Sequence, residues 1–185
     1  MSKYLIDTEN MTITESKYED ITTSIATAME SCIGATEYDD TVKRIQKWYY
    51  GREIEAAWCA TGLSYFSNLT GHGDETGKHE NVDRMKEYMM ADNSFIINNF
   101  QYPDTDYETV EVIEPRRGDV VFMSSKHTIN DCTHVGVVSA VDNAVGTLCV
   151  CSCNINSAGR KDGIYLNVYN YKTDKYIVGF GMIKE

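Results

Sequence analysis

Apolar residues in the first half of the chain recur at steps of three and four positions, which predicts helices. In the best-defined case, Leu63, Phe66 and Leu69 form one apolar face that should be buried. This helix is expected to begin at Cys59. It should end at Gly71, because glycine readily adopts the left-handed conformation of a helix C-terminal cap. The rest of the chain is organised around this helix.

The same spacing predicts helices over residues 16–33, 36–50 and 80–91. The first of these should begin with a capping box at Ser16, in which a side chain caps free backbone N–H groups. Its apolar stripe must be buried against something, so we expect it to dock on the rest of the protein. Residues 1–15 are predicted to form a polar, irregular start.

From Pro115 onward the pattern changes to short apolar runs separated by turns, which predicts strands. The predicted strands span residues 119–123, 134–141, 147–154, 164–169 and 176–183. Helices followed by hairpin-connected strands are typical of α+β proteins. We therefore predict N-terminal helices packed on an antiparallel sheet of about five strands. Residues 1–35 are interpreted as an N-terminal helical extension and residues 36–185 as the main domain.

The composition narrows the classes of partner. The 185 residues carry a net charge of -11, which argues against nucleic acid and against adsorption to anionic membranes. No stretch of 18 apolar residues occurs, so no transmembrane helix is expected. The N-terminus does not resemble a secretory signal peptide, so we expect synthesis in the cytoplasm and interpret the six cysteines as reduced thiols.

The candidate nucleophile is Cys59. A cysteine at a helix N-terminus meets free N–H groups and the positive end of the helix dipole, which both favour the thiolate. The alternative is that Cys59 is an inert, buried small residue. The best candidate base is His134, which opens a predicted strand beside a polar loop. His127, His72 and His79 lie in more polar loops.

Three cysteines alternate along one predicted strand. Cys149, Cys151 and Cys153 should share one face of the sheet, because strand side chains alternate. That face could pack under the helices or point toward solvent or a groove. Zinc sites normally have at least two residues between paired cysteines, so this spacing disfavours a metal site. The loop around His72 and His79 also lacks a metal-binding spacing. No metal and no cofactor are expected.

Ser152 and Asn154 should share the opposite face of that strand. Asn154 ends the strand beside the one that His134 begins. An asparagine there could hydrogen-bond one imidazole nitrogen and leave the other free to act on Cys59.

Four short motifs follow one another along the chain. They are Trp58-Cys59-Ala60, Pro115-Arg116-Arg117-Gly118-Asp119, His134-Val135-Gly136-Val137-Val138 and Asn154. Together, over roughly residues 40–183, they resemble the CHAP family, the cysteine- and histidine-dependent amidohydrolases and peptidases of the papain-like clan. Each motif alone is weak, whereas four in order at family-like separations are fairly specific.

The resemblance implies a papain-like CHAP fold in residues 36–185 and a bacteriophage endolysin-like hydrolase of the bacterial cell wall. Its partner would be peptidoglycan. Cys59 and His134 would be catalytic, with Asn154 as the orienting group and Ser152 where many members carry glutamate. The scissile bond would be either the N-acetylmuramoyl-L-alanine amide or a peptide bond of the cross-link. The acidic calcium-binding stretch of some members is not matched here.

Other expectations remain open. Tyr49, Tyr50 and Trp58 are candidate walls of a substrate groove, although simple core packing would equally explain them. One alternative function is an intracellular or effector papain-like cysteine amidase or peptidase with a non-wall substrate. Another is a catalytically degenerate CHAP-like binding subunit. If the lysin interpretation holds, the protein acts on the wall after release during phage lysis, with any partner subunit or wall-binding module unknown.

Overall fold

The structure is a computed structural model and describes residues 4–7, 12–15, 24–103, 114–156 and 161–184. The helices of this described part are α1 (Ile25–Glu30), α2 (Asp40–Tyr50), α3 (Cys59–Leu69), α4 (Gly73–Thr76) and α5 (Val82–Ala91). Its strands are β1 (Tyr4–Asp7), β2 (Thr12–Glu15), β3 (Phe95–Ile97), β4 (Val120–Met123), β5 (His134–Asp142), β6 (Thr147–Ile155), β7 (Gly163–Asn170) and β8 (Ile177–Gly181). No helix among these is long and apolar enough to cross a membrane.

Six strands form one antiparallel sheet in the order β3-β8-β4-β5-β6-β7. The α+β prediction is therefore confirmed. The five predicted strands correspond to β4–β8, and β3 is a sixth strand that the sequence did not indicate. It has only three residues, Phe95–Ile97, which is too short to show an alternating pattern. Strand β1 pairs with β2 in a separate antiparallel hairpin, so the prediction of an irregular start over residues 1–15 was wrong.

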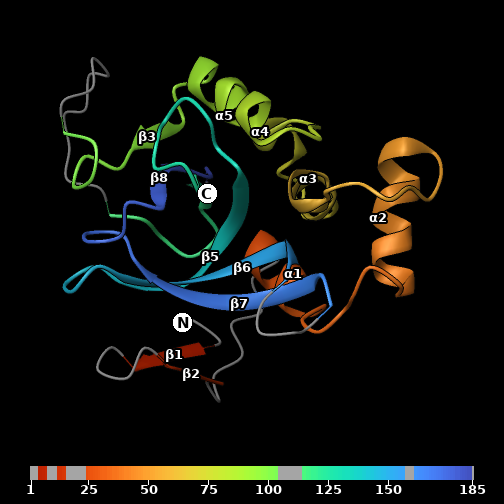
Figure 1. Ribbon diagram of the computed structural model, residues 1–185, viewed down its shortest axis with the longest axis horizontal. Coiled ribbons are helices and arrows are strands. Elements are labelled where there is room, and N and C mark those ends of the chain that lie inside the picture. The colour runs from red at the N-terminus through yellow and green to blue at the C-terminus, as the bar shows by residue number, and fades with distance from the viewer. Residues whose placement is uncertain (1–3, 8–11, 16–23, 104–113, 157–160, 185) are drawn as a thin grey trace.

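The helices α1 and α3 cover one face of the sheet, whereas α2 lies at the edge of the molecule (Figure 1). Helix α3 packs on β5 and β6, α1 packs on the same strands, and α2 packs on α3. A core cluster fills the space between these helices and the sheet. A second cluster lies among the strands themselves, formed by Val121, Met123, Val138, Leu148, Val150, Tyr171, Ile177 and Phe180. The sheet is therefore buried on both faces, and α3 lies at its centre.

Helix α3 begins at Cys59, as predicted, and ends in a Schellman turn. Gly71 has a φ of 86°, and the His72 N–H donates to the Ser67 carbonyl at 2.8 Å. The buried stripe is shorter than predicted, because Leu69 is 58% exposed. Three-residue steps advance only 300° around a helix, so the stripe drifts away from the core by its last member.

Helix α1 begins at Ile25, where the Ser24 hydroxyl accepts a hydrogen bond from the Thr27 N–H at 3.2 Å. The predicted cap, Ser16, lies outside the described residues. The expected docking is confirmed, because Ile25 and Met29 are fully buried in the core cluster beneath α3. Residues 25–30 therefore share one core with the main domain.

A buried ion pair fastens α1 to the sheet. The Glu30 side chain is completely buried, and its two carboxylate oxygens accept from the guanidinium of Arg117 at 2.5 and 2.8 Å. Arg117 also donates to the Thr27 hydroxyl, and Ser139 on β5 donates to Glu30. The charges are thus paired and their hydrogen bonds are mostly satisfied, which is the condition for tolerating them in a core.

We predict that Arg117→Met lowers the free energy of unfolding by about 3–5 kcal/mol, because it leaves the Glu30 carboxylate buried without its counter-charge. Urea unfolding at neutral pH measures this. The double variant Glu30→Met/Arg117→Met should lose less than the single variant, since it leaves no unpaired charge. Lys184→Met, which removes the exposed partner of Asp92, is the matched control and should have a small effect. Equal stability of Arg117→Met and wild type would contradict this account.

Candidate active site

Cys59 is the first residue of α3 and lies where this helix meets the start of β5. Its side chain is buried, with only 7% of the residue exposed. The backbone N–H groups of Ala60 and Val135 reach the thiol. Val135 follows His134 directly, so the thiol and the imidazole come from adjoining segments.

The thiol is not activated in the way the sequence predicted. Burial raises the pKa of Cys59 above its ordinary value, and the nearby N–H groups of Ala60 and Val135 lower it only in part. Desolvation disfavours the thiolate, and here it outweighs the attraction of the helix N-terminus. In the free protein, burial of Cys59 thus opposes the preference for the thiolate that the helix N-terminus is expected to give.

His134 begins β5 and is partly buried. Burial lowers the pKa of its imidazole to about 4, so the ring is neutral at physiological pH. Its Nε2 atom is buried and has no hydrogen-bond partner among the described residues. No hydrogen bond therefore connects this atom to Cys59. At rest the two groups form a neutral thiol and a neutral imidazole.

The parity of β6 resolves which way its side chains point. Cys151 and Cys153 lie in the core cluster under the helices. Of the two orientations that the sequence left open for this face of the strand, it is therefore the one packed under the helices. Ser152 faces the other way and pairs with Gly136 of β5. A Cβ at Gly136 would come within 2.2 Å of the Ser152 hydroxyl oxygen, so only glycine fits there. That hydroxyl is buried and has no partner among the described residues.

Asn154 lies where the pairing of β6 with its neighbours becomes irregular. The register with β7 shifts between Ser152 and Ile155, and Asn154 has a φ of 58°. Asparagine tolerates this left-handed conformation better than most residues. Asn154 is one of the residues that line the groove described in the next paragraph.

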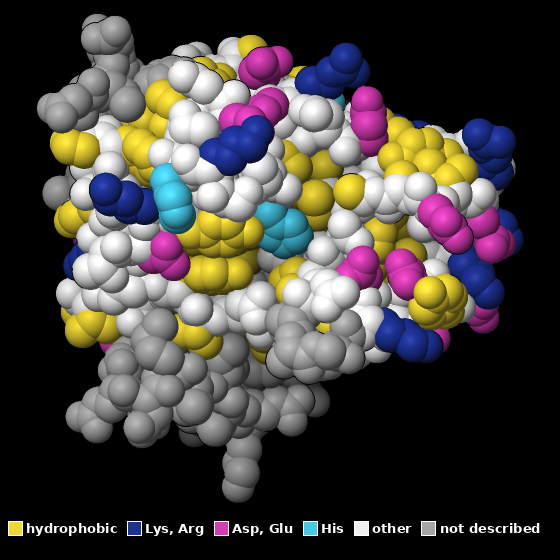
Figure 2. Space-filling view, in the orientation of Figure 1, with side chains coloured by type: hydrophobic (Ala, Val, Ile, Leu, Met, Phe, Trp, Pro, Cys, Tyr) yellow, Lys and Arg dark blue, Asp and Glu magenta, His cyan; other side chains and the backbone are white. Residues whose placement is uncertain are grey.

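A groove of about 830 Å³ runs along the loop that precedes Cys59. Its walls are formed by Glu37, Tyr38, Lys43, Gln46, residues 53–58, Asn154 and Asp162. Trp58 is thus part of the groove, as the sequence suggested. Figure 2 shows acidic side chains close together on the α2 side of this face. Trp58, the residue before the candidate nucleophile, belongs to the lining, whereas Cys59 and His134 do not.

Tyr49 and Tyr50 do not line this groove. Their rings meet edge to face at 4.6 Å, and the Tyr49 hydroxyl donates to Glu80. Tyr50 nevertheless lies near the candidate nucleophile, because the charge of Cys59 contributes to raising the Tyr50 pKa, after burial and Glu80. Both tyrosines are held in an aromatic cluster at the end of α2.

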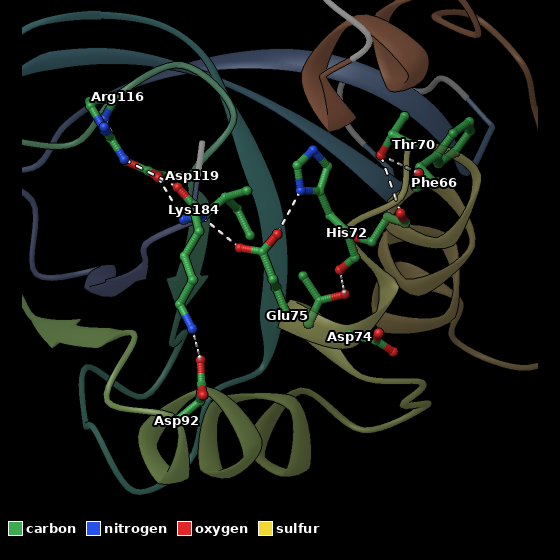
Figure 3. Close-up of polar contacts among 12 residues, drawn as sticks. Phe66, Thr70, His72, Asp74, Glu75, Asp92, Arg116, Asp119 and Lys184 are labelled. Atoms are coloured by element: carbon green, nitrogen blue, oxygen red, sulfur yellow. Dashed lines mark hydrogen bonds and ion pairs between the residues drawn. The ribbon is translucent and has the colours of Figure 1, made fainter.

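The other histidines have different environments. Figure 3 shows His72 pointing at Glu75, and the two side chains meet at 2.7 Å. Glu75 also accepts from the backbone N–H of Lys184 at 2.5 Å, so this cluster ties α4 to the C-terminal segment. His127 is exposed, and His79 stacks against Tyr88. Cys59 takes part in none of the contacts described here for His72 and His79.

The Pro-Arg-Arg-Gly-Asp sequence has a structural role. Asp119 is 1% exposed and accepts from the backbone N–H groups of Arg116 at 2.7 Å and Ile183 at 3.0 Å. Gly118, with a φ of 97°, allows the turn before β4. The carboxylate thereby joins the start of β4 to the segment after β8, as Figure 3 also shows.

The acidic residues of the groove were missed by sequence reasoning. Glu37 and Asp162 are 125 positions apart, and a bridge between Thr36 and Gly163 brings them together. The Glu37 N–H donates to the Asp162 carbonyl at 3.0 Å. Glu53 and Glu55 lie in the acidic stretch before the Cys59 motif, which the sequence analysis compares only with the calcium-binding stretch of CHAP members.

All six cysteines lie in the described part of the chain and are free thiols, which confirms that prediction. Among the described residues no group of three or more histidine, cysteine, aspartate or glutamate side chains is arranged to hold a metal ion.

We predict that His134 makes stability depend on pH between 6.5 and 4. An unfolded histidine titrates near 6.5 and the folded one near 4, so below pH 6.5 the unfolded state binds the proton first. The stability difference between wild type and His134→Gln should fall by up to about 3 kcal/mol as the pH drops through this range. Urea unfolding of both proteins at several pH values measures it. A difference that does not change with pH would contradict the buried, neutral imidazole.

We also predict that iodoacetamide alkylates Cys59 slowly near pH 7 and faster as the pH rises beyond 9, because burial raises the pKa of the thiol. Peptide mass mapping separates Cys59 from the partly exposed Cys32, which serves as the internal reference. Rapid alkylation of Cys59 at pH 6 would show instead that a thiolate–imidazolium pair exists in the free protein.

Comparison of the chain with protein-family models, with curated proteins and with solved structures gives no match. The resemblance to CHAP enzymes consequently rests on four short motifs and their order. What the structure adds is an α+β fold in which Trp58 of the first motif and Asn154 line one groove.

Proposed function

We propose that the chain is a CHAP-like, papain-like cysteine hydrolase that cleaves an amide bond of bacterial peptidoglycan. The observation that carries the proposal is the position of Cys59, at the N-terminus of α3, directly after the groove residue Trp58 and near the backbone of Val135, which follows His134. A helix N-terminus meeting the start of a strand that carries histidine is the arrangement of papain-like nucleophiles.

The neutral resting state determines how the reaction would begin. The Cys59 thiol transfers its proton to the neutral His134 as the sulfur attacks the carbonyl carbon of the amide. The N–H groups at the start of α3 have no partner within the helix, so they can donate to the negative oxygen of the tetrahedral intermediate. No ion pair needs to exist before substrate binds.

In the second half of the reaction, His134 passes on the proton that it took from Cys59. Protonated His134 gives its proton to the leaving amine as the C–N bond breaks, which leaves a thioester on Cys59. His134 then removes a proton from water, whose oxygen attacks the thioester and releases a carboxylic acid and the thiol. The amide is hydrolysed with no net oxidation or reduction.

Two polar groups of β6 are candidates for orienting His134. Asn154 lines the groove together with Trp58, and Ser152 has a buried hydroxyl without a partner among the described residues. In papain-like triads an asparagine performs this role. Asn154 is the stronger candidate, because its side chain belongs to the groove and Ser152 is opposite Gly136 within the sheet.

We predict that the wild-type protein releases peptide fragments from purified bacterial walls and that Cys59→Ala lowers the rate by at least about a thousandfold, because the nucleophile is lost. Mass spectrometry of the new amino termini distinguishes an amidase from an endopeptidase. Cys32→Ala, which removes a thiol outside the groove lining, is the control and should retain activity. Asn154→Ala should lower the maximal rate more than Ser152→Ala.

A second candidate is a catalytically degenerate binding subunit. The raised pKa of Cys59 and the unpartnered Nε2 of His134 favour it, since neither group is preset for catalysis. Equal activity of wild type and Cys59→Ala would refute the hydrolase. Inactivity of both on walls from several bacteria, with no rapid labelling of Cys59 by a peptide carrying an electrophile, would support the binding subunit. Rapid labelling without wall hydrolysis would indicate a cysteine amidase or peptidase with a non-wall substrate.

A further inference from the structure

Helix α5 carries a lysine that is buried although its side chain is charged. Lys86 is 6% exposed, and its ammonium contacts three groups. It forms an ion pair with Asp83 at 3.0 Å, donates to the backbone carbonyl of Ile129 and hydrogen-bonds with the thiol of Cys132. An ammonium has three N–H donors, and three acceptors surround it here. The surroundings of this side chain therefore match a lysine and no apolar residue.

The contacts of Lys86 outside α5 lie in the loop between β4 and β5, which leads directly into His134. Asp83 holds the same loop, because its carboxylate accepts from the backbone N–H of Cys132 at 2.9 Å. Figure 1 shows this loop passing close to α5. Helix α5 thus fastens the chain at Ile129 and again at Cys132, two positions before the candidate base.

The last part of this loop is also held by the sheet. The Thr133 N–H donates to the carbonyl of Met123 at 2.8 Å, and its hydroxyl accepts from the N–H of Ser125 at 2.9 Å. His134 is paired with Met123 as the first residue of β5. The sheet therefore fixes this segment from the β4 side, and the contacts of Lys86 and Asp83 fix it from the helix side.

Net stability does not explain why α5 has a charged pair at this place. Removing a charge from water costs free energy that an ion pair offsets only in part, so such a pair adds little net stability. Val82, Met85 and Met89 already give α5 its apolar contact with the core. The pair instead makes the position of the loop specific, because a displaced loop would leave a buried ammonium without its acceptors.

We propose that Lys86 and Asp83 are positioning residues for His134, which hold residues 129–132 against α5 and thereby keep the imidazole in its buried place at the start of β5. They act through the loop and not on a substrate. This inference rests on the proposed function for the catalytic role of His134, whereas the burial of its ring can be measured without any catalysis.

Release of the loop should be visible in the protonation of His134. Burial is the only cause that lowers the pKa of this imidazole to about 4, with no contribution from a charged side chain. If the loop leaves α5, water reaches the ring and its charged form is solvated. The pKa of His134 should then rise toward 6.5, the ordinary value for histidine.

The test measures this pKa by NMR, from the pH dependence of the imidazole ¹³Cε1 and ¹Hε1 resonances, with His134→Gln used to assign the signal. We expect Lys86→Met and Asp83→Ala each to raise the pKa by at least about one unit. The two variants separate positioning from charge. Loss of the Lys86 cation alone would raise the imidazole pKa, whereas loss of the Asp83 anion alone would lower it.

Two further measurements complete the test. Arg84→Met removes an exposed cation from the same helix and should leave the pKa of His134 unchanged. In the wild type, hydrogen exchange of the Cys132 amide should be at least about tenfold slower than that of the exposed Asn130, because only the Cys132 N–H donates to Asp83. This second measurement needs no variant, so it decides the matter even if a variant fails to fold.

An unchanged pKa in folded Lys86→Met and Asp83→Ala, a lowered pKa in Asp83→Ala, or equally fast exchange of the Cys132 and Asn130 amides would overturn the inference. The outcome is separable from that of the proposed hydrolase. Wall hydrolysis by the wild type with an unchanged pKa in both variants would refute the positioning role alone. A raised pKa in both variants of a protein that hydrolyses no wall would retain the positioning of His134 and refute the hydrolase.

Discussion

The packing of α3 on the centre of the sheet is the constraint on which the core and the candidate site both depend. The contact is close because Gly62 lies directly over Cys153, where a Cβ would come within 2.6 Å of the sulfur. Leu63 and Phe66 fill the space around it, each contributing about 1.5–3 kcal/mol by burial. Since the helix cannot shift along the strands without a clash, its first residue, Cys59, is fixed beside the start of β5.

Around this contact, polar groups in the interior hold the outlying segments in place. The Glu30–Arg117 pair fastens α1 to β5, and Asp119 joins the start of β4 to the chain after β8. Such groups determine how the segments are positioned more than they raise net stability. The free energy lost when a charge is removed from water offsets much of the free energy gained from its ion pair. Two of them, Arg117 and Asp119, come from the Pro-Arg-Arg-Gly-Asp motif, so at least part of that motif serves the fold.

The same burial that holds α3 in place determines the chemistry of Cys59 and His134. Desolvation raises the pKa of the thiol and lowers that of the imidazole, and each shift favours the neutral form. A substrate that filled the groove would alter this balance by adding its own dipoles and charges.

The sequence alone determined the features that depend on local periodicity. Apolar spacing and the left-handed glycine predicted α3 from Cys59 onward, and short apolar runs between turns predicted β4–β8, because these patterns are set by local sequence and backbone geometry. The proximity of Cys59, His134 and Asn154 to one another remained a prediction from motif order. The structure puts Cys59 beside the start of β5 and Asn154 on the adjoining groove, but joins no pair of them by a hydrogen bond.

Only the tertiary structure decided the remaining features, since they arise from residues far apart in the chain. The acidic groove needs the bridge between Thr36 and Gly163, and the ion pair of Glu30 with Arg117 spans 87 positions. The protonation states of Cys59 and His134 depend on how deeply each is buried, which no local pattern specifies. Local periodicity thus determined where the helices and strands lie along the sequence. Contacts between distant segments determined how deeply Cys59 and His134 are buried, and therefore which protonation state each side chain favours.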